Sequence, residues 1–251
     1  MTDKKMPQPA FAEPMIYVHA KGCEQINDQS LQGLLELGFP LCSRLFYKGL
    51  TQTTHGYDQP RLLLTELKEL FPGRPVIFMR AGLQVSRQLI DELINLFPTP
   101  DHPAAITLLS NAESALNPFS GLQTTADISQ YDAVGLVNLL SPGQVHSVNN
   151  WVDHFVFLPT RLVIQLAERG ESGNIMQQLR AVGASLTVPD HLFLHDPTAR
   201  LITPLKLQPY ETVRPPAFGE LSARIQAWFD AGIENLPFAP DSETPVTLHI
   251  T

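Results

Sequence analysis

Histidines and carboxylates adjoin one another three times in the second half of the sequence, and these side chains are the best suited to chemistry. His191 and His195 lie four residues apart, so on a β-strand they would share one face. Imidazole and carboxylate groups together can bind a divalent metal ion. The alternative is structural, with polar side chains at loop ends satisfying backbone groups, and both readings stay open. The three pairs are Asp153-His154, Asp190-His191 and His195-Asp196.

A second group of polar residues follows short apolar runs, where β-strands would end. Arg80 comes after the run 76–79, and Ser110-Asn111 come after the run 104–109. Ligands of parallel α/β sheets bind outside the carboxyl ends of the strands. A small-molecule site is therefore expected at these three residues.

The first apolar run, 15–20, also ends in polar residues. His19 lies at its end and Lys21 follows directly. Both join the three residues above as candidates for binding the same small molecule.

The elements that must position these side chains alternate regularly in the first 110 residues. Apolar runs typical of buried strands alternate with amphipathic segments typical of helices, for example 86–97 with Ser86 as its N-cap. Such alternation predicts right-handed crossovers and a parallel sheet. Strands are expected at 15–20, 42–47, 76–79 and 104–109, and helices at 27–38, 58–70 and 86–97.

The second half is less regular. A loop is expected at 114–128, and a last amphipathic helix after Pro216 carries Leu221, Ile225, Trp228 and Phe229. Further strands are expected at 133–140, 151–158, 186–188 and 192–194, and further helices at 160–168 and 174–182. The predicted fold class is α/β, with a doubly wound, mostly parallel sheet and an irregular second half.

Composition narrows the function classes. The chain has 251 residues, 43% of them apolar, and a net charge of −8, which disfavours nucleic-acid binding because that depends on neutralising phosphates. No apolar run approaches the roughly 20 residues that span a bilayer. The polar N-terminus lacks a signal-peptide centre, so a cytoplasmic location is expected. Cys23 and Cys42 are too few for a disulfide framework and are expected to be packing residues.

Several motifs are absent from the sequence. It contains no phosphate-binding loop with Lys-Ser/Thr and no G-x-G-x-x-G after the first strand, which disfavours a dinucleotide dehydrogenase. It contains no G-x-S-x-G elbow, which disfavours an α/β-hydrolase.

Four segments together resemble the inverting nucleotide-sugar glycosyltransferases of family 2, which have the GT-A fold. The resemblance covers roughly residues 14–200 and depends on order and spacing rather than on one motif. The matching segments are 76–85, 106–112, 170–183 and 188–195.

The resemblance implies sugar transfer from a nucleotide-diphospho-sugar to a glycan or lipid-linked acceptor in bacterial surface polysaccharide or lipopolysaccharide synthesis. It implies a cytoplasmic enzyme, peripheral at the inner membrane, that uses Mg²⁺ or Mn²⁺. His19, Lys21, Arg80, Ser110 and Asn111 would lie at the donor site.

The chain departs from the family pattern at two places. The acidic metal-binding triplet is replaced by the turn 80–82, where Arg80 could pair with a diphosphate directly. The catalytic Asp is replaced by Asn174, with Glu171 nearby as a substitute. His195 matches a histidine that lies near the metal in that family. Asp153, Glu171 and His195 are therefore the candidate base or acceptor-side residues, and no residue is assigned as a metal ligand.

The expected organisation is a tail at 1–13, a GT-A-like domain at 14–213, a helix at 214–235, and a linker with a strand at 236–251. The β-rich end 246–251 is interpreted as the first strand of a following glycosyltransferase domain of the same polypeptide, or as an edge strand of the same sheet. Because two carboxylate motifs are lost, a non-catalytic interaction module with the same fold is the alternative function. An unrelated nucleotide-binding α/β enzyme is a third interpretation.

Overall fold

The chain divides into two compact units, which are described separately. Unit 1 comprises Met1–Thr107 with Ser147–Thr187, and unit 2 comprises Leu108–His146 with Val188–Thr251. The computed structural model describes residues 14–19, 36, 64–65, 68–69, 72–80, 82–83, 85–96, 104–112, 116–122, 128, 130–149, 152, 154–169, 175–197, 199–202 and 216–231.

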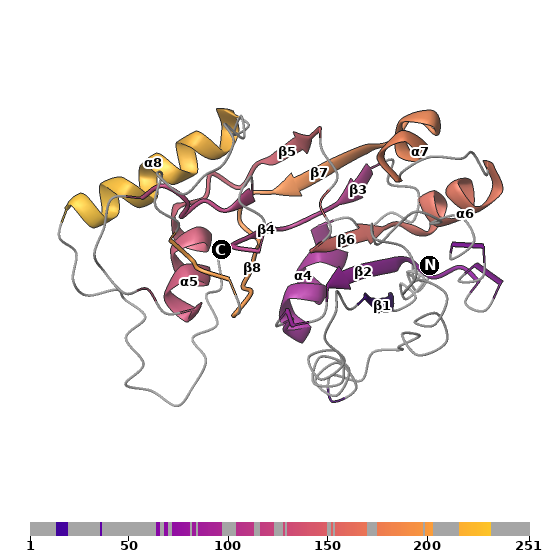
Figure 1. Ribbon diagram of the computed structural model, residues 1–251, viewed down its shortest axis with the longest axis horizontal. Helices are drawn as coiled ribbons and strands as arrows, with labels where there is room; N and C mark the ends of the chain where they lie inside the picture. The colour runs from indigo at the N-terminus through magenta and orange to yellow at the C-terminus, as the bar shows by residue number, and fades with distance from the viewer. Residues whose placement is uncertain are drawn as a thin grey trace, which may run out of the picture. The chain divides into compact units, whose positions relative to one another are not determined.

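A mixed six-stranded sheet, in the order β1-β2-β6-β3-β7-β5, is the main element of the fold (Figure 1). Strands β1 and β2 pair in parallel, and so do β3 and β7. Strand β6 lies between β2 and β3 and is antiparallel to both. The strands are β1 (Met15–His19), β2 (Val76–Arg80), β6 (Phe155–Leu158), β3 (Ala104–Ile106), β7 (Ser185–Pro189) and β5 (Val145–Val148).

The α/β class and the mostly parallel sheet are confirmed, but β6 interrupts the parallel order. Its four residues are all buried, as are all three residues of β3, so both strands are apolar throughout. A wholly apolar run predicts that a strand is buried on both faces, but it does not predict whether the strand is parallel or antiparallel to its neighbours. The insertion of β6 means that β2 and β3 run in the same direction without pairing.

Three helices of unit 1 lie where the sequence predicts them. Ser86 caps α4 (Arg87–Leu96) through a 3.1 Å hydrogen bond from the Leu89 amide to its Oγ, and Ile90 and Leu93 are buried. Helix α6 (Thr160–Arg169) buries Leu162, Val163, Leu166 and Ala167. Helix α7 (Ile175–Ala181) is followed by Gly183, whose φ of 73° suits glycine at a helix end.

The run 104–109 is two strands rather than the single strand expected. After β3, the Thr107 amide donates to Thr187 O at 2.7 Å, and its buried hydroxyl donates to Phe155 O at 2.8 Å. The chain then enters β4 (Leu109–Ser110), which pairs in parallel with β8 (Phe193–Leu194) in a separate two-stranded sheet. Thr107 therefore lies between the two strands with both its amide and its hydroxyl hydrogen-bonded to main-chain carbonyls.

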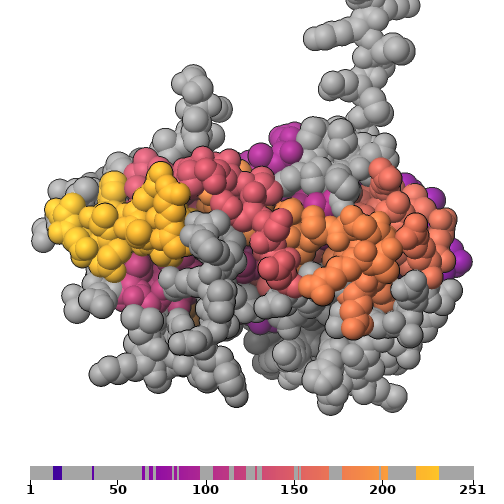
Figure 2. Space-filling model, turned by 90° about the horizontal axis from the view of Figure 1, so that it is seen from above, coloured from indigo at the N-terminus to yellow at the C-terminus, as the bar shows by residue number. Residues whose placement is uncertain are grey.

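The expected strand at 133–140 is wrong, because these residues lie in helix α5 (Gln130–Leu140). Ala133, Leu136 and Val137 are fully buried at positions i, i+3 and i+4, so the helical period decides over the β-branched valines. Helix α5 packs against α8 (Pro216–Asp230), where Leu221 and Ile225 are buried as expected. Figure 2 shows α8 in yellow on the face of the molecule seen in that view.

Several expected elements fall wholly or partly outside the described residues. These are the strand 42–47, most of the helix 27–38, much of the loop 114–128, and the end of the chain from 232. Of the helix expected at 58–70, the four described residues 64, 65, 68 and 69 are helical. Within the described part of the chain, no helix is long and apolar enough to cross a membrane.

Candidate functional site

The small sheet of unit 2 brings three of the candidate residues together. Strands β4 and β8 are parallel, with Ser110 opposite Leu194. The next residue on each strand is Asn111 and His195, so both lie at the carboxyl edge of a parallel pair. Ligands of α/β proteins bind at such edges, which makes this the first place to look for a site.

Asn111 holds a turn with its side chain rather than offering it to a ligand. Its Nδ2 donates to Asp196 O at 2.8 Å and to Ala199 O at 2.9 Å, and its Oδ1 accepts from the Asp196 amide at 2.7 Å. Both amide hydrogens are therefore used. The residue is only 6% exposed, and its amide holds the turn at 196–199; its expected role in donor binding stays a prediction.

Asn117 continues the same arrangement and was not singled out by the sequence as a functional residue. Its Nδ2 donates to Leu201 O at 2.8 Å, while its Oδ1 accepts from the Phe119 amide at 3.0 Å. The latter bond is an Asx turn, for which Asn-Pro-Phe is the sequence signal. Residues 196–201, of which all but Thr198 are described, are called the clamped segment below, because Asn111 and Asn117 fix their main chain.

His195 precedes the clamped segment and is partly buried. Its Nδ1 is buried and, within the described part of the chain, has no hydrogen-bond partner. Burial lowers the pKa of His195 below its usual range, and the neighbouring Asp196 carboxylate opposes this by raising it. The imidazole is therefore neutral at neutral pH, with one of its two ring nitrogens unprotonated.

The lowered pKa predicts how acid affects stability. The unfolded chain binds a proton at His195 near pH 6.5, and the folded chain binds it only at lower pH. As the pH falls through about 6.5, the unfolded state takes up the proton first, so the free energy of unfolding decreases. Well above that pH the histidine is neutral in both states and adds no pH dependence.

Denaturant unfolding of the wild type and of His195→Gln from about pH 8 to pH 5 measures this contribution. The free energy of unfolding of the wild type should fall more on acidification than that of the variant. Parallel curves for the two proteins would contradict the assignment.

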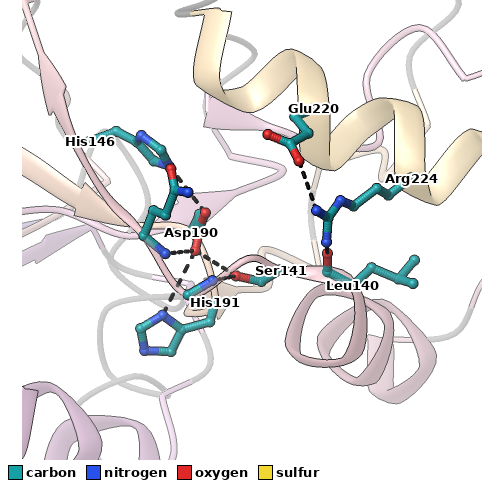
Figure 3. Close-up of polar contacts among 9 residues, drawn as sticks. Leu140, Ser141, His146, Asp190, His191, Glu220 and Arg224 are labelled. Carbon is teal, nitrogen blue, oxygen red and sulfur yellow. Dashed lines mark hydrogen bonds and ion pairs between the residues drawn. The ribbon is translucent and has the colours of Figure 1, made fainter.

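A second polar cluster of unit 2 surrounds the buried carboxylate of Asp190, which is 1% exposed (Figure 3). Its Oδ1 accepts from Ser141 Oγ at 2.5 Å and from the Gln144 amide at 2.8 Å. Its Oδ2 lies 3.1 Å from His146 Nε2, and its Oδ1 lies 3.9 Å from His191 Nδ1. Asp190 thus ties the loop after α5 to the turn after β7.

This cluster does not form a nucleophilic triad, although it contains Ser, His and Asp. A triad requires the histidine between serine and carboxylate, so that the imidazole takes the hydroxyl proton. Here the carboxylate stands between Ser141 and His146, and the hydroxyl donates to the acid directly. The arrangement supports a loop rather than a covalent mechanism.

The remaining candidates are distributed as follows. His19 and Arg80 are paired residues at the carboxyl ends of the parallel strands β1 and β2 of unit 1. The Arg80 side chain is partly buried, and its amide donates to His154 O at 2.8 Å. Ser110 is buried, and its Oγ accepts from the Ala112 amide at 3.0 Å. Lys21, Asp153 and Glu171 lie outside the described residues.

The structure does not bring the histidine–carboxylate pairs together as the strand interpretation expected. His191 lies in a turn and β8 covers only Phe193–Leu194, so the expected strand face shared by His191 and His195 is not present. Among the residues that the structure describes, no three His, Cys, Asp or Glu side chains are grouped so that they could hold a metal ion.

Comparison of the sequence with models of known protein families finds no match, and no curated protein matches it.

Proposed function

We propose that this chain is a glycosyltransferase-like domain that binds a nucleotide-diphospho-sugar, with His195 at the donor or acceptor side, in bacterial surface polysaccharide synthesis. The observation that carries the proposal is the partly buried His195, with its unpartnered Nδ1, at the carboxyl edge of β4 and β8. The α/β class supports it, since nucleotides bind at such edges in this class. The GT-A fold itself is part of the proposal.

The chemistry of sugar transfer suits a neutral imidazole. An acceptor hydroxyl must lose a proton as it attacks the sugar, and a positioned base contributes about 10²–10⁴-fold to such a step. Because burial lowers its pKa, His195 is neutral at neutral pH and can accept that proton. Asp153 and Glu171 stay in the proposal as further candidates for this role.

The leaving nucleoside diphosphate needs its negative charge stabilised. A separate candidate lies in unit 1, where Arg80 at the end of β2 and His19 opposite it on β1 would contact a diphosphate, with no part assigned to His195 of unit 2. Lys21 is a further candidate. Among the described residues, no three His, Cys, Asp or Glu side chains are grouped so that they could hold a metal ion, and the Mg²⁺ or Mn²⁺ of the proposal is given no ligand in the chain. No step is therefore assigned to a metal.

One observation favours the alternative, a non-catalytic interaction module of the same fold. Asn111, a candidate donor-site residue, has both amide hydrogens committed to main-chain carbonyls. A non-catalytic module would keep such a strand end, because Asn111 there stabilises the fold rather than contacting a ligand. Helix α8, with the partly exposed Trp228 and Phe229, would then contact a neighbouring glycosyltransferase domain.

Isothermal titration calorimetry with UDP-, GDP- and dTDP-sugars, with and without Mn²⁺, tests the proposal. We expect at least one nucleotide-sugar to bind, and the corresponding free sugars, which lack the diphosphate, to give no heat. Binding followed by transfer in the wild type but not in His195→Gln would support catalysis. Binding without transfer in either protein would favour the module, and silence across the whole panel would contradict nucleotide-sugar binding.

A further inference from the structure

Arg200 lies in the clamped segment and is exposed. Within the described part of the chain, it makes no hydrogen bond or ion pair. The main chain on both sides of it is fixed, because Ala199 O accepts from Asn111 and Leu201 O accepts from Asn117. The guanidinium is thus available while its backbone is held in place.

The turn that precedes Arg200 brings it back toward His195. The Ala199 amide donates to Asp196 O at 3.2 Å, which closes a four-residue turn. Both Asp196 O and Ala199 O accept from Asn111 Nδ2, at 2.8 and 2.9 Å, so the two oxygens lie at most about 6 Å apart. His195 directly precedes this turn and Arg200 directly follows it, so the main chains of the two residues lie close together.

The two charged residues of the clamped segment, Asp196 and Arg200, differ in their exposure to solvent. Asp196 is 2% exposed, whereas Arg200 is exposed, so the carboxylate and the guanidinium occupy different environments. An exposed arginine without a described anionic partner can bind an external anion, and at Arg200 the main chain on both sides is also fixed.

We propose that Arg200 binds the phosphate groups of the ligand whose sugar or acceptor faces His195. This inference deepens the proposed function and rests on it for the identity of the ligand as a nucleoside diphosphate derivative. A guanidinium presents a planar fork of donors that matches phosphate oxygens in pairs. Because Asn111 and Asn117 fix the backbone beforehand, less conformational freedom is lost when the ligand binds.

Arg161 provides a matched control for this assignment. It is also exposed, and its side chain makes no hydrogen bond or ion pair within the described residues, but it lies on helix α6 in unit 1. Arg161→Gln and Arg200→Gln change the net charge equally. A difference between the two variants therefore reports the position of the arginine rather than the total charge.

Calorimetric titration with inorganic pyrophosphate and with UDP, at low salt, tests the proposal on the whole chain. We expect both probes to bind the wild type, and Arg200→Gln to weaken binding by about tenfold or more, as expected for the loss of a charge-assisted bond. Arg200→Lys, which keeps the charge but not the fork, should weaken it less, and Arg161→Gln should match the wild type. Thermal unfolding of each variant confirms that it is folded.

The outcomes separate this proposal from the proposed function. Pyrophosphate binding that depends on Arg200, with no response to any nucleotide or nucleotide-sugar, would uphold the phosphate site and refute the nucleotide-sugar function. UDP binding that is equal in the wild type and Arg200→Gln would overturn the role of Arg200 and leave the nucleotide function standing. An equal loss in Arg161→Gln, or no binding of either probe to the wild type, would also overturn it.

Discussion

Replacing Asp190 with alanine is expected to lower the free energy of unfolding by about 3 to 5 kcal/mol. The substitution removes the acceptor for Ser141 Oγ and for the Gln144 amide, together with the partner of His146 Nε2. These groups, of which Ser141 and His146 are partly buried, would lose the acceptor that they share. Denaturant unfolding measures the loss, and hydrogen exchange at the Gln144 amide should become faster because its acceptor is gone.

Two variants make the result interpretable. Asp190→Asn keeps an oxygen acceptor but loses the charge, so it should cost about half as much as alanine. Asp230→Ala removes a carboxylate from the exposed last turn of α8 and should change the free energy of unfolding by less than about 0.5 kcal/mol. If Asp190→Ala behaved like the Asp230 control, the loop after α5 would not depend on Asp190.

Replacing Asn111 with alanine should lower the free energy of unfolding by about 3 kcal/mol. The amide makes three hydrogen bonds to the main chain of Asp196 and Ala199, and the Asp196 groups are buried. Each main-chain group left without a partner adds to the cost. Urea unfolding monitored by circular dichroism measures the change.

Asn95, exposed near the end of α4, provides the matched control for Asn111. Asn95→Ala should change stability by less than about 0.5 kcal/mol. Asn111→Ala should also release the turn at 196–199, so hydrogen exchange at the Ala199 amide should accelerate in that variant alone. A stable Asn111→Ala protein with unchanged exchange would show that the clamped segment holds itself in place.

Elements with a local signal could be predicted from the sequence. The helix at α4 is marked by Ser86 and its apolar period, and the end of α7 is marked by Gly183. A strand is expected from the sequence where α5 lies, although the buried residues of α5 have the i, i+3, i+4 spacing of a helix. Here the helical period was the better guide, and it was available in the sequence.

The candidate site could be predicted only in part. Apolar runs indicate that strands end near Ser110 and before His195, but they do not predict that β4 and β8 pair in a separate sheet. The role of Asn111 could not be predicted, because its partners are main-chain atoms 85 and 88 residues away. Asp190 is a similar case, since its partners Ser141 and His146 lie 49 and 44 residues earlier in the chain. No side-chain pattern marks such contacts.

The position of β6 between β2 and β3 has a consequence for synthesis on the ribosome. Residues 76–80 and 104–106 emerge first, but they do not pair with each other and instead pair with opposite sides of 155–158. The central strands β2, β6 and β3 therefore cannot assemble until residues 155–158 have left the exit tunnel. Until then, the nascent chain carries two apolar strands that each lack their partner at 155–158, and such open strand edges promote aggregation.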